Sequence, residues 1–262
     1  FGEKSLLSNT KGDFNIAIGK NSLFSNTTGS SNVAVGHSAL QNNISTNNLV
    51  AIGDSALFFF FSGSGKNTAI GSKALFANTN GNSNTATGFN AMRSNTTGVN
   101  NTANGESAMF SNIDGINNTA IGAGALFSNT NGNGNTAVGI SAANANTTGN
   151  DNTAIGNHSF SNNTTGFKNT ALGSETLANN SIGNYNTAVG EFALVFNTTG
   201  SNNIAVGASA LENNNSANAS IAIGTAALAN SNISRQVAIG DSALYNLNGG
   251  SGFNTAVGAR EL

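Results

Sequence analysis

The chain has 262 residues and a formal net charge of −2, with no Pro and no Cys. The lack of Cys excludes disulfide and thiolate chemistry, and the sparse, nearly balanced charge argues against nucleic-acid binding or a polybasic membrane patch. The lack of Pro suits a backbone whose amides donate to neighbouring segments throughout, because Pro has no amide hydrogen to donate.

The whole chain consists of one repeat of seventeen residues, with the consensus G-x-x-A-L-x-x-N-T-T-G-x-x-N-T-A-V, in which the opening Gly is position 1. A short fixed period over a whole chain is typical of a solenoid, in which each copy contacts only its neighbours. The copies begin at Gly2, Gly19, Gly36, Gly53, Gly71, Gly88, Gly105, Gly122, Gly139, Gly156, Gly173, Gly190, Gly207, Gly224, Gly240 and Gly258.

Each copy is too short for a helix-turn-helix unit, and its apolar positions do not recur with a helical period of about 3.6 residues. Instead, each copy has two short apolar or β-branched runs separated by Asn, Gly, Ser and Thr. This pattern predicts two strands and two corners per copy. We therefore predict an all-β fold, a parallel β-solenoid of about fifteen coils, as a single repeat domain that covers residues 1–262.

The ends of the sequence are in phase with the repeat. Phe1 already precedes an opening Gly, and Leu262 lies five residues into a sixteenth copy. A natural solenoid needs capping elements over its open ends, and the sequence shows none. We therefore expect the chain to be a fragment of a longer protein.

Neighbouring apolar residues recur in every copy, as in Ala39-Leu40 and Ala34-Val35. Successive side chains of a strand point to opposite faces, so both faces of such strands would be apolar. An exposed apolar stripe is a liability unless identical chains cover it, in a closed cyclic arrangement. We assign positions 5, 15 and 17 to the coil interior and the small residues at positions 4 and 16 mainly to a subunit contact. The inverse assignment of the apolar pairs is the alternative.

Polar positions recur as strictly as apolar ones. Asn is common at positions 8 and 14, as in Asn26 and Asn32, where we expect bonds to the corner backbone and stacked amide ladders. Gly at positions 1 and 11 is expected to supply corners with positive φ. Positions 2 and 3 predict an exposed edge, because they carry most of the charges: Glu3, Lys4, Lys20, Asp54, Lys73, Glu106, Glu175, Glu191 and Asp241.

The segments Val50-Ala51-Ile52-Gly53 and Val237-Ala238-Ile239-Gly240 resemble the head repeats of trimeric autotransporter adhesins. The form N-T-A-I-G-x-x-A-L-x-x-N-T-T-G is similar to repeats in large bacterial surface proteins and phage-type tail fibres. The resemblance covers the whole chain. It implies a left-handed parallel β-roll, three chains side by side, and a role in attachment.

Candidate catalytic residues are few. The histidines, His37 and His158, stand about seven coils apart, so we expect them to be surface variation. Glu175 and Glu191 occupy positions 3 and 2 of consecutive coils, and a carboxylate pair is what a glycosidase needs, but a regular coil should offer no cleft. The turns carry Asn where calcium-binding repeats need Asp. We predict no enzyme activity, no cofactor and no metal site.

The most irregular stretch is Phe58, Phe59, Phe60 and Phe61, in the eighteen-residue coil that begins at Gly53. Position 6 often holds Phe, so Phe58 is expected, but three further Phe residues and an inserted residue indicate a bulge with an aromatic surface. One interpretation is a packing plug between chains, and the other is a contact with a binding partner. These four residues are the candidate partner-contact site.

We expect an extracellular structural fibre or adhesin segment, on a cell surface or in a virion or injection-device fibre, that acts by rigidity and multivalent display. Its expected partners are copies of itself, as a homotrimer, and a cell-surface glycan or protein receptor. We expect no nucleic acid and no membrane insertion, because the apolar run at residues 56–61 is too short to span a bilayer. The alternatives are an ice-binding solenoid and a tailspike-like fibre that binds or degrades polysaccharide.

Overall fold

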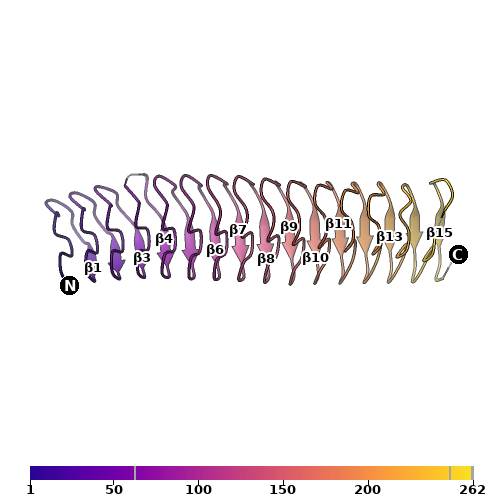
Figure 1. The fold of residues 1–262 in the computed structure, drawn as a ribbon, viewed down its shortest axis with the longest axis horizontal. Helices are drawn as coiled ribbons and strands as arrows, with labels where there is room; N and C mark the ends of the chain where they lie inside the picture. The colour runs from indigo at the N-terminus through magenta and orange to yellow at the C-terminus, as the bar shows by residue number, and fades with distance from the viewer. Residues whose placement is uncertain (62, 248, 261–262) are drawn as a thin grey trace. The chain divides into compact units, whose positions relative to one another are not determined.

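The computed structural model describes residues 1–61, 63–247 and 249–260, so the last two residues of the sixteenth copy lie outside the described residues. The chain divides into two units, Phe1–Asn133 and Gly134–Leu262. Within each unit, successive coils stack and each coil contributes one short strand (Figure 1).

The first unit contains β1 (Ile16–Ile18), β2 (Val33–Val35), β3 (Val50–Ile52), β4 (Thr68–Ile70), β5 (Thr85–Thr87), β6 (Thr102–Asn104) and β7 (Thr119–Ile121). The second unit contains β8 (Thr136–Val138), β9 (Thr153–Ile155), β10 (Thr170–Leu172), β11 (Thr187–Val189), β12 (Ile204–Val206), β13 (Ile221–Ile223), β14 (Val237–Ile239) and β15 (Thr255–Val257).

Consecutive strands within each unit pair in parallel and in register, which confirms the parallel β-solenoid. In the first unit Ala17 pairs with Ala34, and in the second Ala137 pairs with Ala154. The strand register is kept where a coil is longer than seventeen residues. Val50 pairs with Thr68, although the coil between them has an extra residue. Insertions are therefore absorbed in the corners, where they do not shift side chains to the wrong face of the strand.

The prediction of two strands per coil is wrong, because the run at positions 4 and 5 is a series of turns. Ser38 and Leu40 have φ of 57° and 51°, outside the β region, and the same holds for positions 3 and 5 of the other coils. Backbone hydrogen bonds between coils continue through this run, as from Leu40 N to Ala56 O at 3.0 Å. These bonds offset the cost of about 1–2 kcal/mol for each left-handed residue.

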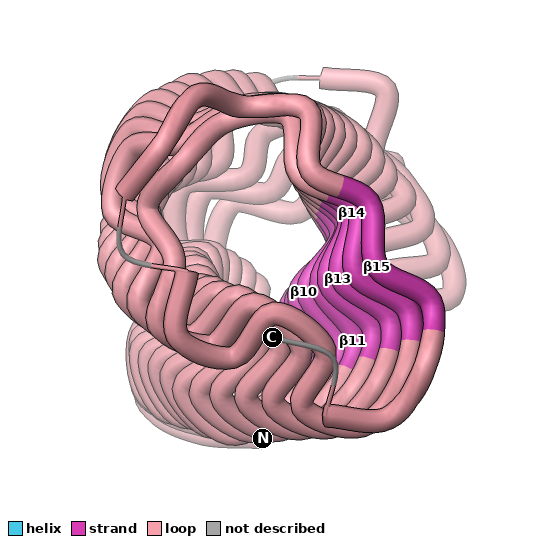
Figure 2. Tube along the Cα trace, turned by 90° about the vertical axis from the view of Figure 1, so that its right-hand side faces the viewer, coloured by secondary structure: helices cyan, strands magenta, loops and turns pink. Residues whose placement is uncertain are grey.

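The turn run explains how neighbouring apolar residues are both buried. Ala39 and Leu40 point into the coil together and are 0% exposed, and so is Ala34 from the middle of β2. The small residues at positions 4 and 16 therefore form the interior with the large residue at position 5, and the predicted role of the small residues in a subunit contact is wrong. Figure 2 shows the strands of the second unit along one side of its coils.

Two rows of buried Asn side chains form the polar part of the interior, as predicted. At position 14, Nδ2 of Asn84 donates to Gly98 O at 2.7 Å, and its Oδ1 accepts from the backbone N of Asn101 at 3.0 Å. At position 8, Nδ2 of Asn112 donates to Oδ1 of Asn95 at 2.7 Å. Each amide thus ties its own corner to an adjacent coil, which satisfies polar groups that would otherwise be costly to bury.

Glycine is invariant at position 1 and frequent at position 11, where Thr46 and Ala217 replace it in two of the seventeen-residue coils. Gly105, at position 1, has φ of +147°, as the sequence predicts for a corner. Gly98, at position 11, is not among the residues with positive φ, so that prediction is wrong for position 11. At Gly98 space favours Gly, because a Cβ there would lie 2.6 Å from Gly115 O in the next coil.

Candidate functional site

The outer face of the strands carries positions 15 and 17, and we call this surface the strand face. Ala at position 16 is buried from β1 to β14, whereas its two neighbours in each strand are half-buried or exposed. Ile52 and Ile121, both at position 17, are 38% and 41% exposed. The predicted interior placement of positions 15 and 17 is therefore wrong. Side chains of a strand alternate, so the inward Ala forces both neighbours outward.

The strand face is apolar or β-branched in almost every coil. In the first unit, position 17 holds Ile18, Val35, Ile52, Ile70, Thr87, Asn104 and Ile121, and in the second it holds Val138, Ile155, Leu172, Val189, Val206, Ile223, Ile239 and Val257. Position 15 is Thr in β4 to β7 and in β8 to β11, and Val or Ile in most other strands. Each unit therefore presents a repeating apolar stripe, of the kind that marks an interaction surface in a soluble protein.

The four predicted partner-contact residues have different surroundings. Phe60 is 0% exposed and stands at position 8, in the place of the Asn that most other coils bury there. Phe58 is half-buried, and its ring stacks on Phe76 with 5.5 Å between centroids. Phe59 and Phe61 are 38% and 44% exposed. Phe60 is thus an internal plug, and contact with a partner stays a prediction for the exposed pair.

A row of aromatic and cationic side chains at position 6 continues from Phe76 in the first unit, and sequence reasoning did not anticipate it. The guanidinium carbon of Arg93 lies 5.8 Å from the ring centroid of Phe76 and 5.6 Å from that of Phe110. Phe110 in turn stacks on Phe127 at 5.1 Å. The recurrence of Phe at position 6 was the available signal. Because these groups cover one another's faces, the row stabilises the stacking of coils.

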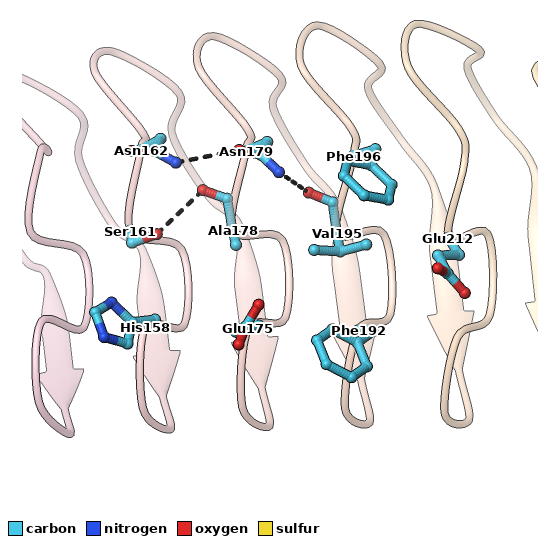
Figure 3. A pocket seen from close by; sticks show the side chains of 10 residues that line it. All are labelled: His158, Ser161, Asn162, Glu175, Ala178, Asn179, Phe192, Val195, Phe196 and Glu212. Atoms are coloured by element: carbon cyan, nitrogen blue, oxygen red, sulfur yellow. Dashed lines mark hydrogen bonds between the residues drawn. The ribbon is translucent and has the colours of Figure 1, made fainter.

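The second unit has a groove of about 500 Å³ that crosses four coils (Figure 3). Its lining comes from positions 3, 6 and 7 of those coils: His158, Ser161, Asn162, Glu175, Ala178, Asn179, Phe192, Val195, Phe196 and Glu212. The expectation that a regular coil offers no cleft is wrong here. Phe192 stands at position 3, where other coils carry small or polar residues, and Phe196 stands at position 7, where the other coils except that of Phe59 do so too. The two rings form the sides of the groove. Glu191, expected beside Glu175, is not among the lining residues.

Ion pairs join adjacent coils along the edge at positions 2 and 3. Nζ of Lys20 lies 2.9 Å from Oε2 of Glu3, and this hydrogen bond lowers the pKa of the Glu3 carboxyl below its usual range. Nδ1 of His37 lies 3.0 Å from Oδ1 of Asp54. On this edge, Glu3 and Asp54 thus each contact a basic side chain one coil away, and exposed pairs of this kind contribute little to stability.

Within the described residues there is no group of three or more His, Cys, Asp or Glu side chains placed to hold a metal ion. In the same part of the chain, no helix is both long enough and apolar enough to cross a membrane.

No protein-family model matches the chain, and no curated protein sequence matches it significantly. What is established is therefore a β-solenoid of seventeen-residue repeats with stacked Asn ladders.

Proposed function

We propose that the chain is a segment of an extracellular structural or adhesive fibre, in which three copies pack side by side through their strand faces. The observation that carries the proposal is the strand face itself, where apolar residues such as Ile52 and Ile121 stand outward at position 17 in almost every coil. Contiguous exposed apolar surface of this kind favours a covered state, because its burial removes apolar area from water.

A second copy of the chain is the partner that fits this surface best. Coils repeat about every 4.8 Å along a parallel ladder, and only a partner with the same axial period can contact every coil alike. Another copy has that period by construction. A closed cyclic arrangement gives every chain the same contact and leaves no strand face uncovered. The resemblance of Val50-Ala51-Ile52-Gly53 to the head repeats of trimeric adhesins supports three chains.

Such an assembly would act as a rigid spacer with multivalent display. Each outward feature of one chain would occur three times, and linked weak sites bind a surface far more tightly than a single site. Phe59 and Phe61 are exposed in the first unit and stand at positions 7 and 9 of their coil, whereas the strand face consists of positions 15 and 17. An assembly through the strand face would therefore leave both rings available to a receptor. A cell-surface glycan or protein is the proposed target.

The first test is the solution mass of the chain, measured by light scattering coupled to size exclusion. A mass of three times 26.2 kDa supports the proposal. A stable monomer across a range of concentrations contradicts it, since the strand face would then be tolerated in water.

One observation favours a second candidate, an ice-binding solenoid. Thr stands outward at position 15 in four successive strands of each unit: Thr68, Thr85, Thr102 and Thr119, then Thr136, Thr153, Thr170 and Thr187. Regular rows of Thr on a parallel sheet are a repeating array of methyl and hydroxyl groups. Measurable thermal hysteresis from a monomeric sample would replace the fibre proposal with this one, whereas its absence would remove the candidate.

A further inference from the structure

The groove of the second unit combines an apolar floor with two aromatic walls (Figure 3). The floor is formed by Ala178 and Val195, which are 7% and 5% exposed. Phe192 and Phe196 flank Val195 within the same coil, at positions 3 and 7, and both rings are exposed. A ligand lying over Val195 would therefore contact aliphatic and aromatic carbon on three sides.

Two carboxylates stand on either side of this apolar centre. Glu175 belongs to the coil before Val195, and Glu212 belongs to the coil after it. Among the residues that the structure describes, neither carboxylate forms an ion pair, in contrast to Glu3 on the first unit, which pairs with Lys20.

The amide groups in the groove are already used within the chain. Nδ2 of Asn162 donates to Oδ1 of Asn179 at 3.2 Å, and Nδ2 of Asn179 donates to Val195 O at 3.0 Å. Besides the Ser161 hydroxyl, which donates to Ala178 O at 3.3 Å, and the His158 imidazole, the polar groups that a ligand would meet are the two carboxylates. Because both carboxylates are negatively charged, a complementary ligand has a cationic group at each end of the floor. Because the surface between the carboxylates is apolar, the part of the ligand that joins the two cations should be hydrocarbon.

We propose that this groove binds an aliphatic diamine, with one ammonium group at Glu175, the other at Glu212, and the methylene chain on Val195 between the two rings. The two carboxylate-bearing coils are about 10 Å apart along the axis. Glu175 stands at position 3 and Glu212 at position 6, so the carboxylates are also offset across the coils (Figure 3), and the span left between two charge-assisted N–H···O bonds of about 2.8 Å suits a chain of about four carbons. The rings of Phe192 and Phe196 add apolar contact with the methylene chain. The site belongs to one chain and uses no strand-face residue, so it does not depend on the proposed assembly.

The test is calorimetric titration of the full chain with 1,4-diaminobutane at an ionic strength of about 0.15 M, which screens long-range attraction. We expect one diamine per chain, and we expect n-butylamine, which has one cation, to bind about tenfold more weakly or worse. Failure of the wild-type protein to bind the diamine overturns the proposal. Equal affinity for the diamine and n-butylamine also overturns it, because only one carboxylate would then be engaged.

Variants separate this site from general attraction to an acidic surface. Glu175→Gln and Glu212→Gln should each weaken diamine binding about tenfold, while the matched control Glu191→Gln, a neighbouring carboxylate outside the groove, should change it less than about twofold. Phe192→Ser removes one wall and should also weaken binding. Ser is compatible with that backbone, because Ser209 has φ of 55° at the same position of the next coil. A Glu191→Gln effect as large as that of Glu175→Gln would contradict a specific site.

Discussion

Nδ2 of Asn163 donates to Oδ1 of Asn146, one coil earlier, at 2.6 Å, and both side chains are 0% exposed. The same nitrogen donates to Gly166 O at 3.0 Å, and Oδ1 of Asn163 accepts from Nδ2 of Asn180 at 3.1 Å. One buried amide thus links three successive coils. The position 8 row therefore contributes to stability through donors and acceptors together, and an isosteric change that removes the donors tests this directly.

Asn163→Asp should lower the free energy of unfolding by about 2–4 kcal/mol at neutral pH, because it replaces a donor with a buried negative charge that faces two acceptors, Oδ1 of Asn146 and the Gly166 carbonyl. Burial should raise the pKa of the new carboxyl in the folded state above its unfolded value. The variant should therefore regain stability as pH falls toward the folded pKa and lose it as pH rises. Thermal melting between about pH 4 and pH 7 measures both effects.

The control for this variant is Asn157→Asp, at position 2, where Asn157 is exposed and Asp54 and Asp241 already occupy the row. It should change stability by less than about 0.5 kcal/mol. Equal effects of the two substitutions would show that the buried row does not depend on amide donors.

Phe60→Ala should destabilise the first unit by about 3–5 kcal/mol, because it empties the space of a fully buried ring. Phe61→Ala is the matched control, since Phe61 is 44% exposed and its loss should cost less than about 1 kcal/mol. Hydrogen exchange of the amides in β3 and β4 would report the local loss of protection. Similar exchange in the two variants would contradict the assignment of Phe60 as an internal plug.

Gly105→Ala should be strongly destabilising, by about 2 kcal/mol or more, for two reasons. The φ of Gly105 is +147°, and a Cβ there would lie 2.5 Å from Gly122 O in the next coil. Gly124→Ser should be tolerated, because Gly124 has φ of 65° at position 3, where Ser107 has φ of 54°. The melting temperatures of the two variants test this, and we expect a clear decrease for Gly105→Ala alone. If Gly105→Ala melts at the same temperature as Gly124→Ser, coils can separate locally at little cost in free energy.

Ile70→Lys together with Ile121→Lys should prevent assembly through the strand face, because each places a charge on a surface that the proposed fibre buries. Light scattering should then give the mass of a monomer. The circular dichroism spectrum should stay the same as that of the unsubstituted chain, which shows that the coils are still folded. Ser55→Lys with Ser107→Lys is the control, since Lys73 already stands at that outer position 3. It should leave the assembly intact. Assembly that survives both double variants would place the subunit contact elsewhere.

Much of the fold could be predicted because a repeat specifies which residues stack. When identical residues recur at identical spacing, a parallel, in-register ladder stacks each residue on its own counterpart in the next coil, as Ala17 stacks on Ala34. The buried Asn rows followed from the same logic, since a stacked amide both donates and accepts. A regular repeat therefore predicts the axial neighbours of a residue well.

The sequence alone determined the period, the parallel register and the amide ladders, but only the tertiary structure decided which side of the chain faces inward. Leu40 and Ser38 have positive φ, which neither residue type favours by itself, so the apolar pair at positions 4 and 5 turns inward together and fills the coil. Once that volume is occupied, the strand can direct only its Ala inward, and the β-branched residues at positions 15 and 17 face out. The groove beside Phe192 likewise depends on side chains from four coils, whose lateral arrangement a linear repeat does not encode.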